Sequence, residues 1–378
     1  MRSRLYSSAE DDDAESQNAS FCWWRAAQEP ADNVASALNL ANLSLLTPRL
    51  RLLREMERLN MVAHEGLDEL RHKLLTYRAG DFWLRAGGIE KKDMDIPPMI
   101  SLLLVGLAGS GKSSLVNLMY SVLGRSGLIP FAQTSSESSS YTTILLEEHN
   151  VLRSPRSGFC VYDSRGIDKN RVEEGLDEVA SLMVNGVRHY QLCSRAGDDS
   201  LIDAHLPSAR FATRPVNCAI VVADMADIVK SLRAGDPTPL DATRDLFNLH
   251  AIRKSNENPI LVLTHGDQLP AEERVTARLK ICEFLGVPGT SGAYDIPCLT
   301  EQGILPEEAD PVTSYALSEL VYRVLMQADR SHLPKRKVKD WIMLVFSWIM
   351  CCIGSFFAML AYLFARMSKK HKLKMKRR

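Results

Sequence analysis

The stretch from Leu102 to Val116 reads Leu-Leu-Leu-Val-Gly-Leu-Ala-Gly-Ser-Gly-Lys-Ser-Ser-Leu-Val, and it decides the fold. An apolar run typical of a buried strand leads into the pattern Gly-x-x-x-x-Gly-Lys-Ser between Gly106 and Ser113, and an amphipathic helix start follows. Glycine-rich turns of this kind point backbone N–H groups at an anion, and the helix adds its positive dipole end. The stretch predicts a site for the phosphates of a nucleoside triphosphate.

Each polar residue of this glycine loop (residues 106–114) has an expected partner. Lys112 is expected to reach the terminal phosphates, and the Ser113 hydroxyl to bind Mg²⁺. The residues expected around the phosphate chain are Gly106, Gly109, Ser110, Gly111, Lys112, Ser113 and Ser114. Kinases, ATPases and GTPases all use such a loop, so the later motifs must separate them.

A second motif, Asp-x-x-Gly, occupies Asp163 to Gly166 at the end of a predicted strand. Asp163 is expected to hold Mg²⁺, and the N–H of Gly166 to meet the terminal phosphate. Between the two motifs, Tyr141-Thr142-Thr143 resembles the threonine of GTPases that closes on Mg²⁺ and the terminal phosphate. Thr143 is preferred because the apolar strand starts right after it. The expected metal ligands are Ser113, Thr143 and Asp163.

A third motif lies at Ile260-Leu-Val-Leu-Thr264-His265-Gly266-Asp267, where another apolar run meets a polar loop. It resembles the Asn/Thr-Lys-x-Asp motif with which GTPases recognise guanine. Asp267 would accept hydrogen bonds from the N1–H and the exocyclic amine of guanine, a pairing that adenine cannot reproduce. His265 stands where those proteins usually have lysine, and an imidazole can cover the base instead. The alternative interpretation is an ordinary turn with a solvated aspartate.

The stretch from Ile296 to Gly303 looks like the last strand and the base-contacting loop of GTPases. On that likeness, Thr300 is expected to contact the base. The expected base contacts are Thr264, His265, Asp267 and Thr300.

The residue after Gly166 departs from the GTPase pattern. Ras-like GTPases carry there a glutamine that orients the attacking water, whereas this chain has Ile167, which has no hydrogen-bonding side-chain group. Intrinsic hydrolysis is therefore expected to be slow. Arg165, Asp168 or Arg171 could assist, or a partner could supply an arginine, and no catalytic residue is assigned.

Apolar strands and helical stretches alternate after the glycine loop, which is the pattern of a parallel sheet built from βαβ units. The predicted strands cover residues 101–105, 143–147, 158–162, 217–223, 259–263 and 295–298. The predicted helices cover residues 113–123, 172–187, 239–254, 271–285 and 313–328. We expect an α/β fold of the P-loop NTPase type, with a mostly parallel sheet flanked by helices on both faces.

Several of these stretches together carry a family resemblance. The glycine loop and residues 159–163, 183–189, 259–267, 283–288 and 295–297 resemble a plant-type family of the P-loop NTPase superfamily. The order of motifs is more distantly similar to the TRAFAC GTPases, including the interferon-inducible and septin-like branches. The likeness covers about residues 95–334. It implies a GTPase-type domain that binds Mg²⁺ and a nucleotide at these positions, and it implies no cellular role. The pairing of Asp267 with guanine makes GTP the expected nucleotide in preference to ATP.

The segments before this domain differ from it in composition. Residues 1–32 are polar and acidic, and we expect them to be mostly disordered. We expect a helical segment over residues 33–94, because apolar positions between Leu52 and Leu74 recur at spacings of three and four. That helix is expected to pack on the main domain or, alternatively, to pair with a second copy. Lys plus Arg and Asp plus Glu each number 46, and no nucleic-acid partner is expected.

Near the C-terminus, residues 341–364 form a run of 24 residues without a charged side chain, enough for a transmembrane helix. Residues 365–378 form a basic tail. The N-terminus has no apolar stretch of signal-peptide length. We expect a single-pass, tail-anchored protein whose large domain faces the cytosol, in a membrane that the sequence does not specify. The alternative is a shallow hairpin that bends near Gly354-Ser355 and keeps both basic flanks on the cytosolic surface.

These observations predict a membrane-anchored GTP-binding protein that hydrolyses GTP slowly and acts as a switch, with a second copy or an activating protein as partner. One alternative is a nucleotide-dependent assembly protein with little hydrolysis, held together by the helix between Leu52 and Leu74. Another is an ATP-using P-loop NTPase, in which Asp267 does not contact the base.

Overall fold

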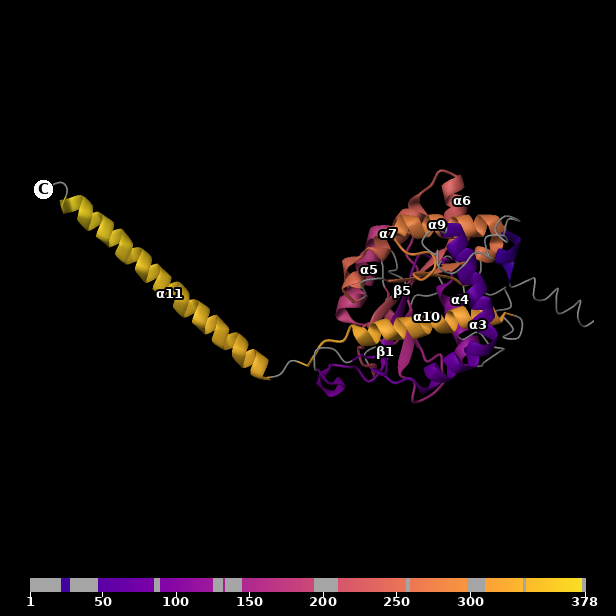
Figure 1. The fold of residues 1–378 in the computed structure, drawn as a ribbon, viewed down its shortest axis with the longest axis horizontal. Coiled ribbons are helices and arrows are strands. Elements are labelled where there is room, and N and C mark those ends of the chain that lie inside the picture. The colour runs from indigo at the N-terminus through magenta and orange to yellow at the C-terminus, as the bar shows by residue number, and fades with distance from the viewer. Residues whose placement is uncertain are drawn as a thin grey trace, which may run out of the picture. The chain divides into compact units, whose positions relative to one another are not determined.

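The computed structural model describes residues 22–27, 47–84, 89–124, 132, 145–193, 210–255, 259–297, 310–335 and 338–375. The chain divides into two units (Figure 1). The α/β unit comprises Met1–Leu84 and Ile96–Ser331, and the C-terminal unit comprises Arg85–Asp95 and His332–Arg378.

A seven-stranded sheet forms the centre of the α/β unit. Its strands are β1 (Ile100–Val105), β2 (Leu145–His149), β3 (Phe159–Asp163), β4 (Gln191–Leu192), β5 (Cys218–Asp224), β6 (Ile260–Thr264) and β7 (Ala293–Asp295). Their order across the sheet is β4-β2-β3-β1-β5-β6-β7. The strands β1, β3, β5, β6 and β7 run parallel, and β2 is antiparallel to both β3 and β4. The predicted α/β fold with a mostly parallel sheet is thereby confirmed.

Helices cover both faces of this sheet (Figure 1). The helices of the α/β unit are η1 (Trp23–Ala27), α3 (Pro48–Thr76), α4 (Lys112–Gly124), α5 (Val172–Asn185), α6 (Met225–Arg233), α7 (Thr238–Phe247), α8 (His250–Ser255), η6 (Gly266–Gln268), α9 (Ala271–Leu285) and α10 (Pro311–Arg330). The helices α3, α4 and α10 contribute to the apolar cluster on one face of the sheet. The helices α5, α6, α7, α8 and α9 contribute to the cluster on the other face.

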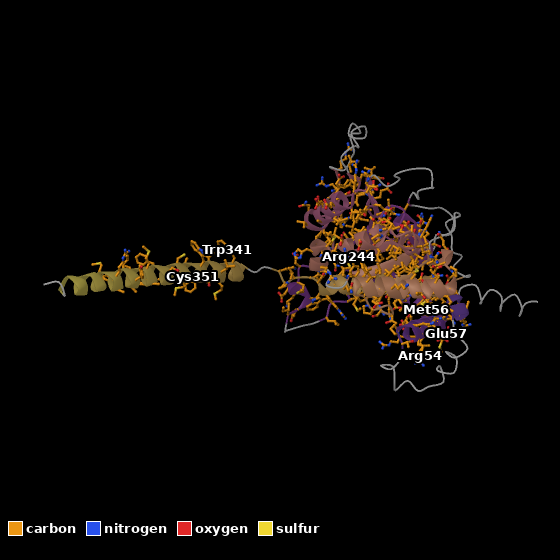
Figure 2. All side chains as sticks on the ribbon, turned by 90° about the horizontal axis from the view of Figure 1, so that it is seen from above. Arg54, Met56, Glu57, Arg244, Trp341 and Cys351 are labelled. Atoms are coloured by element: carbon orange, nitrogen blue, oxygen red, sulfur yellow. The ribbon has the colours of Figure 1, made fainter. Side chains whose placement is uncertain are left out.

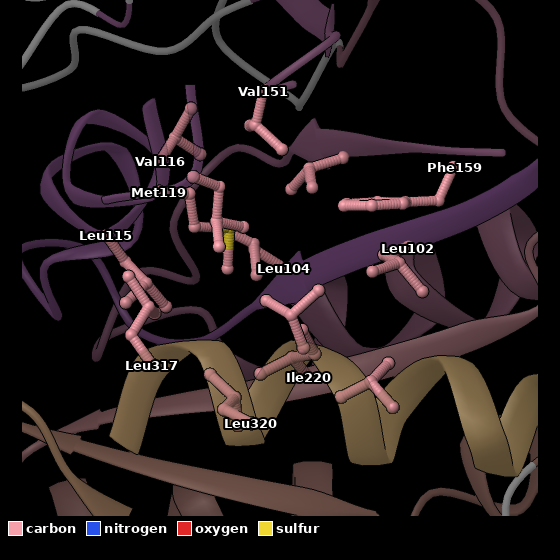
Figure 3. Close-up of a cluster of buried hydrophobic side chains, with 14 of the residues drawn as sticks. Leu102, Leu104, Leu115, Val116, Met119, Val151, Phe159, Ile220, Leu317 and Leu320 are labelled. Carbon is pink, nitrogen blue, oxygen red and sulfur yellow. The ribbon is translucent and has the colours of Figure 1, made fainter. Parts of the chain in front are cut away.

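The residues of β1 alternate between these two clusters. Leu102 and Leu104 join the cluster that contains Leu115 of α4 and Leu317 of α10 (Figure 3). Leu103 belongs to the cluster on the opposite face. Successive side chains of a strand point to opposite faces, so a strand that is covered on both faces is apolar throughout. This burial explains the unbroken apolar run that precedes the glycine loop.

Short elements account for most differences from the prediction. The sequence pattern does not predict β4, which has only two residues, or α6, which follows β5 directly. The helix predicted over 239–254 is divided into α7 and α8. The last strand ends at Asp295, whereas the predicted strand starts there.

The apolar stripe of α3 is buried within the α/β unit. Its residues are Leu52, Met56, Leu59, Ala63, Leu67, Leu70 and Leu74. The helix packs mainly along α10, and its first half also joins a cluster with Trp24 of η1. The expectation that this helix packs on the main domain is confirmed, so the stripe is covered within the chain rather than left for a second copy.

A short part of the polar stretch 1–32 is ordered in the structure. Trp23–Ala27 form the 3₁₀ helix η1, and the Trp24 side chain is fully buried. The Trp24 indole Nε1 donates a hydrogen bond to Glu57 Oε2 of α3 at 3.0 Å, and Glu57 is labelled in Figure 2. Truncation of a buried tryptophan typically costs about 3–5 kcal/mol, so one such side chain can fix a segment whose surroundings in the sequence are polar.

The C-terminal unit contains η3 (Lys91–Asp93) and the long helix α11 (Val338–Met375). Within α11, residues Trp341–Met367 are long and apolar enough to cross a membrane. Their side chains stand out from the helix, as Trp341 and Cys351 show in Figure 2. The helix runs through Gly354 without a break, so the bend of the hairpin alternative is absent from α11. Trp341–Met367 is therefore a candidate membrane span.

Candidate functional site

The glycine loop lies at the centre of the sheet, between the end of β1 and the start of α4. From β1 the chain first builds the half of the sheet that contains β2 and β3, and it then crosses to β5 on the other side of β1. In open parallel sheets, ligands bind beyond the carboxyl ends of the strands at such a change of direction. The topology alone puts the loop at a preferred place for a ligand.

The conformation of the loop depends on two of its glycines. Gly109 has a φ of +77° and Gly111 a φ of +83°, values in the left-handed region that favours glycine. The helix α4 begins at Lys112 and includes Ser113 and Ser114 in its first turn. The first N–H groups of a helix have no partner within the helix, and here they lie at the end of the loop. Loop and helix start together have the geometry that binds anions in proteins.

Gly106 and Gly166 are each pressed against backbone atoms. A Cβ on Gly106 would lie 2.1 Å from the carbonyl oxygen of Val222 on β5. A Cβ on Gly166 would lie 2.5 Å from the Cα of Ala108 in the glycine loop. Rotation of a side chain cannot relieve either contact, because the contacted atoms belong to the backbone. The two predicted phosphate-binding loops are therefore in direct backbone contact.

Replacing Gly106 with alanine is expected to lower the free energy of unfolding by about 2–3 kcal/mol, because β1 or β5 must shift to admit the methyl group. Chemical denaturation of the full-length chain measures this loss. Gly289→Ala is the matched control, since its Cβ would meet only ordinary contacts, the nearest at 3.5 Å. Equal losses in the two variants would contradict the prediction.

Backbone hydrogen bonds join the glycine loop to the Asp-x-x-Gly loop. Ala108 N donates to Ile167 O at 2.8 Å, and Ile167 N donates to Gly106 O at 3.0 Å. The Ile167 side chain is 1% exposed and packs over Gly175 of α5. Ile167 therefore fastens the two loops through its backbone, and its side chain belongs to the core.

Lys112 is buried within the glycine loop. Its Nζ donates hydrogen bonds to Leu107 O at 2.9 Å and to Gly106 O at 3.3 Å. A buried ammonium group is costly unless it is hydrogen-bonded, and these two carbonyl groups supply that compensation. The positive charge of Lys112 is thus held against the carbonyl groups of Gly106 and Leu107.

Ser113 and Asp163 meet at the end of β3. The Ser113 hydroxyl donates to Asp163 Oδ2 at 2.5 Å. Asp163 is 2% exposed, and no described residue donates a hydrogen bond to its Oδ1. Burial raises the pKa of the Asp163 carboxyl to about 6, although the positive charge of Lys112 and the Ser113 hydroxyl both lower it. A hydroxyl and a buried carboxylate, whose second oxygen has no hydrogen-bond donor among the described residues, form a donor set that fits Mg²⁺.

Two predicted ligands fall outside the part of the chain that the structure describes. They are Thr143, predicted to bind the metal, and Thr300, predicted to contact the base.

Thr264 connects the predicted base-recognition loop to the glycine loop. Its Oγ1 donates to Ser110 O at 2.9 Å, and the side chain is fully buried. The next turn forms η6, in which Asp267 is exposed. Asp267 lines a cavity of about 300 Å³ together with Trp23 and Arg274. Thr264 therefore positions the predicted base-recognition loop. The Asp267 side chain lies outside the core and lines this cavity.

A buried ion pair packs against the loop that contains Gly266 and Asp267. Arg274 of α9 contacts both carboxylate oxygens of Asp295, with Nε to Oδ2 and Nη2 to Oδ1 each at 2.8 Å. A Cβ on Gly266 would lie 2.6 Å from Arg274 Nε and 2.8 Å from Asp295 Oδ1. The Arg274 guanidinium also lies 3.9 Å from the centre of the Trp23 ring. The cavity beside Asp267 is thus held by α9, β7 and η1.

His265 adopts a left-handed conformation with a φ of +54°. Its Nδ1 lies 2.9 Å from Asp224 Oδ2, and the other oxygen of Asp224 caps α6 by accepting a hydrogen bond from Asp227 N at 2.8 Å. The hydrogen bond to Asp224 raises the pKa of His265 above its ordinary value. The position predicted to cover a base is therefore tied to the end of β5.

The three residues considered as helpers in hydrolysis have other contacts. Arg165 is buried, and its Nη1 donates to Cys193 O at 2.8 Å. Asp168 accepts a hydrogen bond from the backbone N–H of Asn170 at 2.9 Å, and Arg171 lies 3.7 Å from Glu174 on α5. These contacts belong to the packing of the Asp-x-x-Gly loop and the start of α5.

A second hollow adjoins the glycine loop and contains residues that the sequence analysis missed. It measures about 140 Å³ and is lined by Leu107, Ala108, Gly109, Ser110, Lys169, Asp224, Asp227, Ile228 and Thr243. Lys169 Nζ contacts both carboxylate oxygens of Asp227, at 2.8 and 2.7 Å. Asp224 has a signal in the sequence, because it follows a predicted strand directly, whereas Lys169 has none. No protein-family model matches this chain, and no curated protein matches its sequence.

Proposed function

We propose that this chain is a membrane-anchored protein that binds GTP with Mg²⁺ and hydrolyses it slowly. The observation that carries the proposal is the meeting of Ser113 with Asp163, 2.5 Å apart, beside the glycine loop. Two motifs that lie 50 residues apart in the sequence are thereby joined as a metal site requires. When bound, Mg²⁺ would neutralise charge on the phosphates, and Ser113 and Asp163 would hold it.

The number of groups that can bind phosphate oxygens favours a triphosphate over a smaller anion. The glycine loop offers backbone N–H groups and the start of α4, and Lys112 adds a positive charge. Guanine is favoured by Asp267, whose exposed carboxylate can accept from two donors that adenine lacks. Slow hydrolysis follows from Ile167, because its side chain is buried and carries no group that orients water.

The assembly alternative has less support. It depended on the helix between Leu52 and Leu74 as the contact between subunits, and that stripe is covered by α10 and η1. The ATP alternative differs from the proposal in the base that the site prefers, adenine instead of guanine.

Lys112→Ala is expected to weaken binding of Mg²⁺ and GTP by about 100-fold, because the phosphates lose a buried, charge-assisted contact. A fluorescent GTP analogue, titrated into the full-length chain in detergent, measures this change. Lys73→Ala on the exposed side of α3 is the matched control and is expected to bind like the wild type. If Lys112→Ala kept the full affinity for GTP, the proposed phosphate site would be contradicted.

The anchor is proposed for Trp341–Met367, and it is supported by the length of this apolar helix and the exposure of its side chains. A fluorescent fusion of the full chain is expected to fractionate with membranes, and a fusion that lacks residues 341–378 is expected to be released into the soluble fraction. Burial of about 20 apolar residues in a bilayer is the physical reason for this difference. Membrane association of the truncated fusion would contradict the anchor.

A further inference from the structure

We propose that Lys169 is a phosphate-binding group of this site, released from Asp227 when a nucleoside triphosphate enters, and that it stabilises the charge which develops during hydrolysis. This inference rests on the proposed function. It assigns charge stabilisation to a residue outside the sequence motifs, the role for which an arginine from a partner was considered above.

The position of Lys169 is fixed close to the glycine loop. Ile167, two residues before it, is bonded to Gly106 and Ala108 by the backbone hydrogen bonds described above. Lys169 then lines the hollow that Ala108, Gly109 and Ser110 form on their side facing α6. The ammonium group ends a flexible four-carbon stem, so it can move while its backbone stays fastened.

The charges around this hollow make Lys169 the natural candidate. Among the described residues that line it, Lys169 is the one cation, and the two anions are Asp224 and Asp227. Asp224 is already engaged by His265 and by the first turn of α6. Asp227 is therefore the anion that holds Lys169 in this conformation.

The ion pair is of a kind that a phosphate can displace. The side chains of Lys169 and Asp227 are 39% and 31% exposed. Ion pairs with this exposure are screened by water and contribute little to stability. A terminal phosphate carries more negative charge than one carboxylate, and water is largely excluded from a glycine loop that is occupied by phosphates. Lys169 is thus expected to exchange Asp227 for phosphate oxygens.

The assisted step is hydrolysis of the terminal phosphoanhydride. The oxygen of a water molecule forms a bond to the terminal phosphorus, and the bond from phosphorus to the bridging oxygen breaks. The electron pair of that bond stays with the nucleoside diphosphate, and the water protons pass to the released phosphate and to solvent. Lys169 remains protonated throughout and offsets the negative charge on the oxygens of the transition state.

The test compares Lys169→Ala with Asp227→Asn in the full-length chain in detergent. Lys169→Ala is expected to lower the single-turnover rate of GTP hydrolysis at least about tenfold while the Kd for GTP changes less than about threefold. Asp227→Asn frees Lys169 and is expected to raise the rate, by up to about fivefold. Controls are Lys230→Ala on the exposed side of α6 and Asp241→Asn in the first turn of α7, both at the wild-type rate.

The opposite signs of the two changes distinguish a phosphate-binding lysine from a merely structural ion pair. An unchanged rate in Lys169→Ala would overturn the inference, and so would a loss of rate in Asp227→Asn. A wild-type chain that binds GTP without hydrolysing it would overturn this inference and leave the proposed binding intact. A wild-type chain that binds no GTP would instead overturn the proposed function.

Discussion

Asp163→Asn is expected to make the chelator-treated protein more stable at neutral pH and, at the same time, to abolish the Mg²⁺-dependent part of its affinity for GTP. The carboxylate is buried, and its Oδ1 has no hydrogen-bond partner among the described residues. An uncharged amide of the same shape avoids the loss of hydration that a buried charge suffers. It is also a much poorer ligand for Mg²⁺, so the two effects have opposite signs.

The pH dependence of the free energy of unfolding shows why Asp163→Asn is expected to stabilise the protein. Burial raises the pKa of Asp163 to about 6 in the folded protein, against about 3.9 in an unfolded chain. The folded state therefore binds more protons between these values, so the stability of the wild type falls as the pH rises through this window. The variant lacks this titration. We expect it to be more stable than the wild type by roughly 1–3 kcal/mol above pH 7, and equally stable below about pH 4.

Urea denaturation at several pH values, with the full-length chain in detergent and in the presence of a chelator, measures the difference in stability. Titration of GTP with and without Mg²⁺ measures the binding effect. Asp241→Asn, which removes a half-exposed ion pair with Arg244 in α7, is the control; it is expected to lower the stability by less than about 1 kcal/mol and to leave the Mg²⁺ dependence unchanged. A variant that is less stable at neutral pH, or that keeps its Mg²⁺ dependence, would speak against Asp163 as a buried metal ligand.

Asp267→Ala is expected to reduce the preference for GTP over ATP by at least about 100-fold, since two hydrogen bonds to a charged acceptor are lost together. Affinity for ATP is expected to stay the same or to rise slightly, because adenine has no donor for this carboxylate. Competition of each nucleotide against a fluorescent GTP analogue measures the ratio. Gln268→Ala, the neighbouring exposed residue of η6, is the matched control. An unchanged ratio in Asp267→Ala would favour the ATP alternative.

The parts of the site that were predictable from the sequence are those whose conformation depends on residues adjacent in the chain. The run from Leu102 to Ser113 contains a buried strand, the left-handed glycines and a helix start in succession, so local pattern alone is informative. The pairing of Ser113 with Asp163 followed because the parallel strands β1 and β3 end at the same edge of the sheet. The position of Ile167 followed from its place after Gly166.

The parts that were not predictable depend on partners far apart in the chain. Lys169 and Asp227 are separated by 58 residues, and Arg274 meets Asp295 across 21 residues. Charged residues are common on loops and at helix starts, so no sequence pattern predicts either of these two ion pairs. Trp24 was missed for a similar reason, because its partner Glu57 lies on another element and its own neighbours are polar.

The central claim is that the glycine loop and Asp267 together select GTP with Mg²⁺. Isothermal titration of the full-length wild-type chain in detergent, with GTP and with ATP, each with and without Mg²⁺, tests it most directly. We expect one GTP bound per chain, with an affinity that depends on Mg²⁺ and is at least about 100-fold higher than that for ATP. Equal affinity for the two nucleotides, or no binding of either, would contradict it.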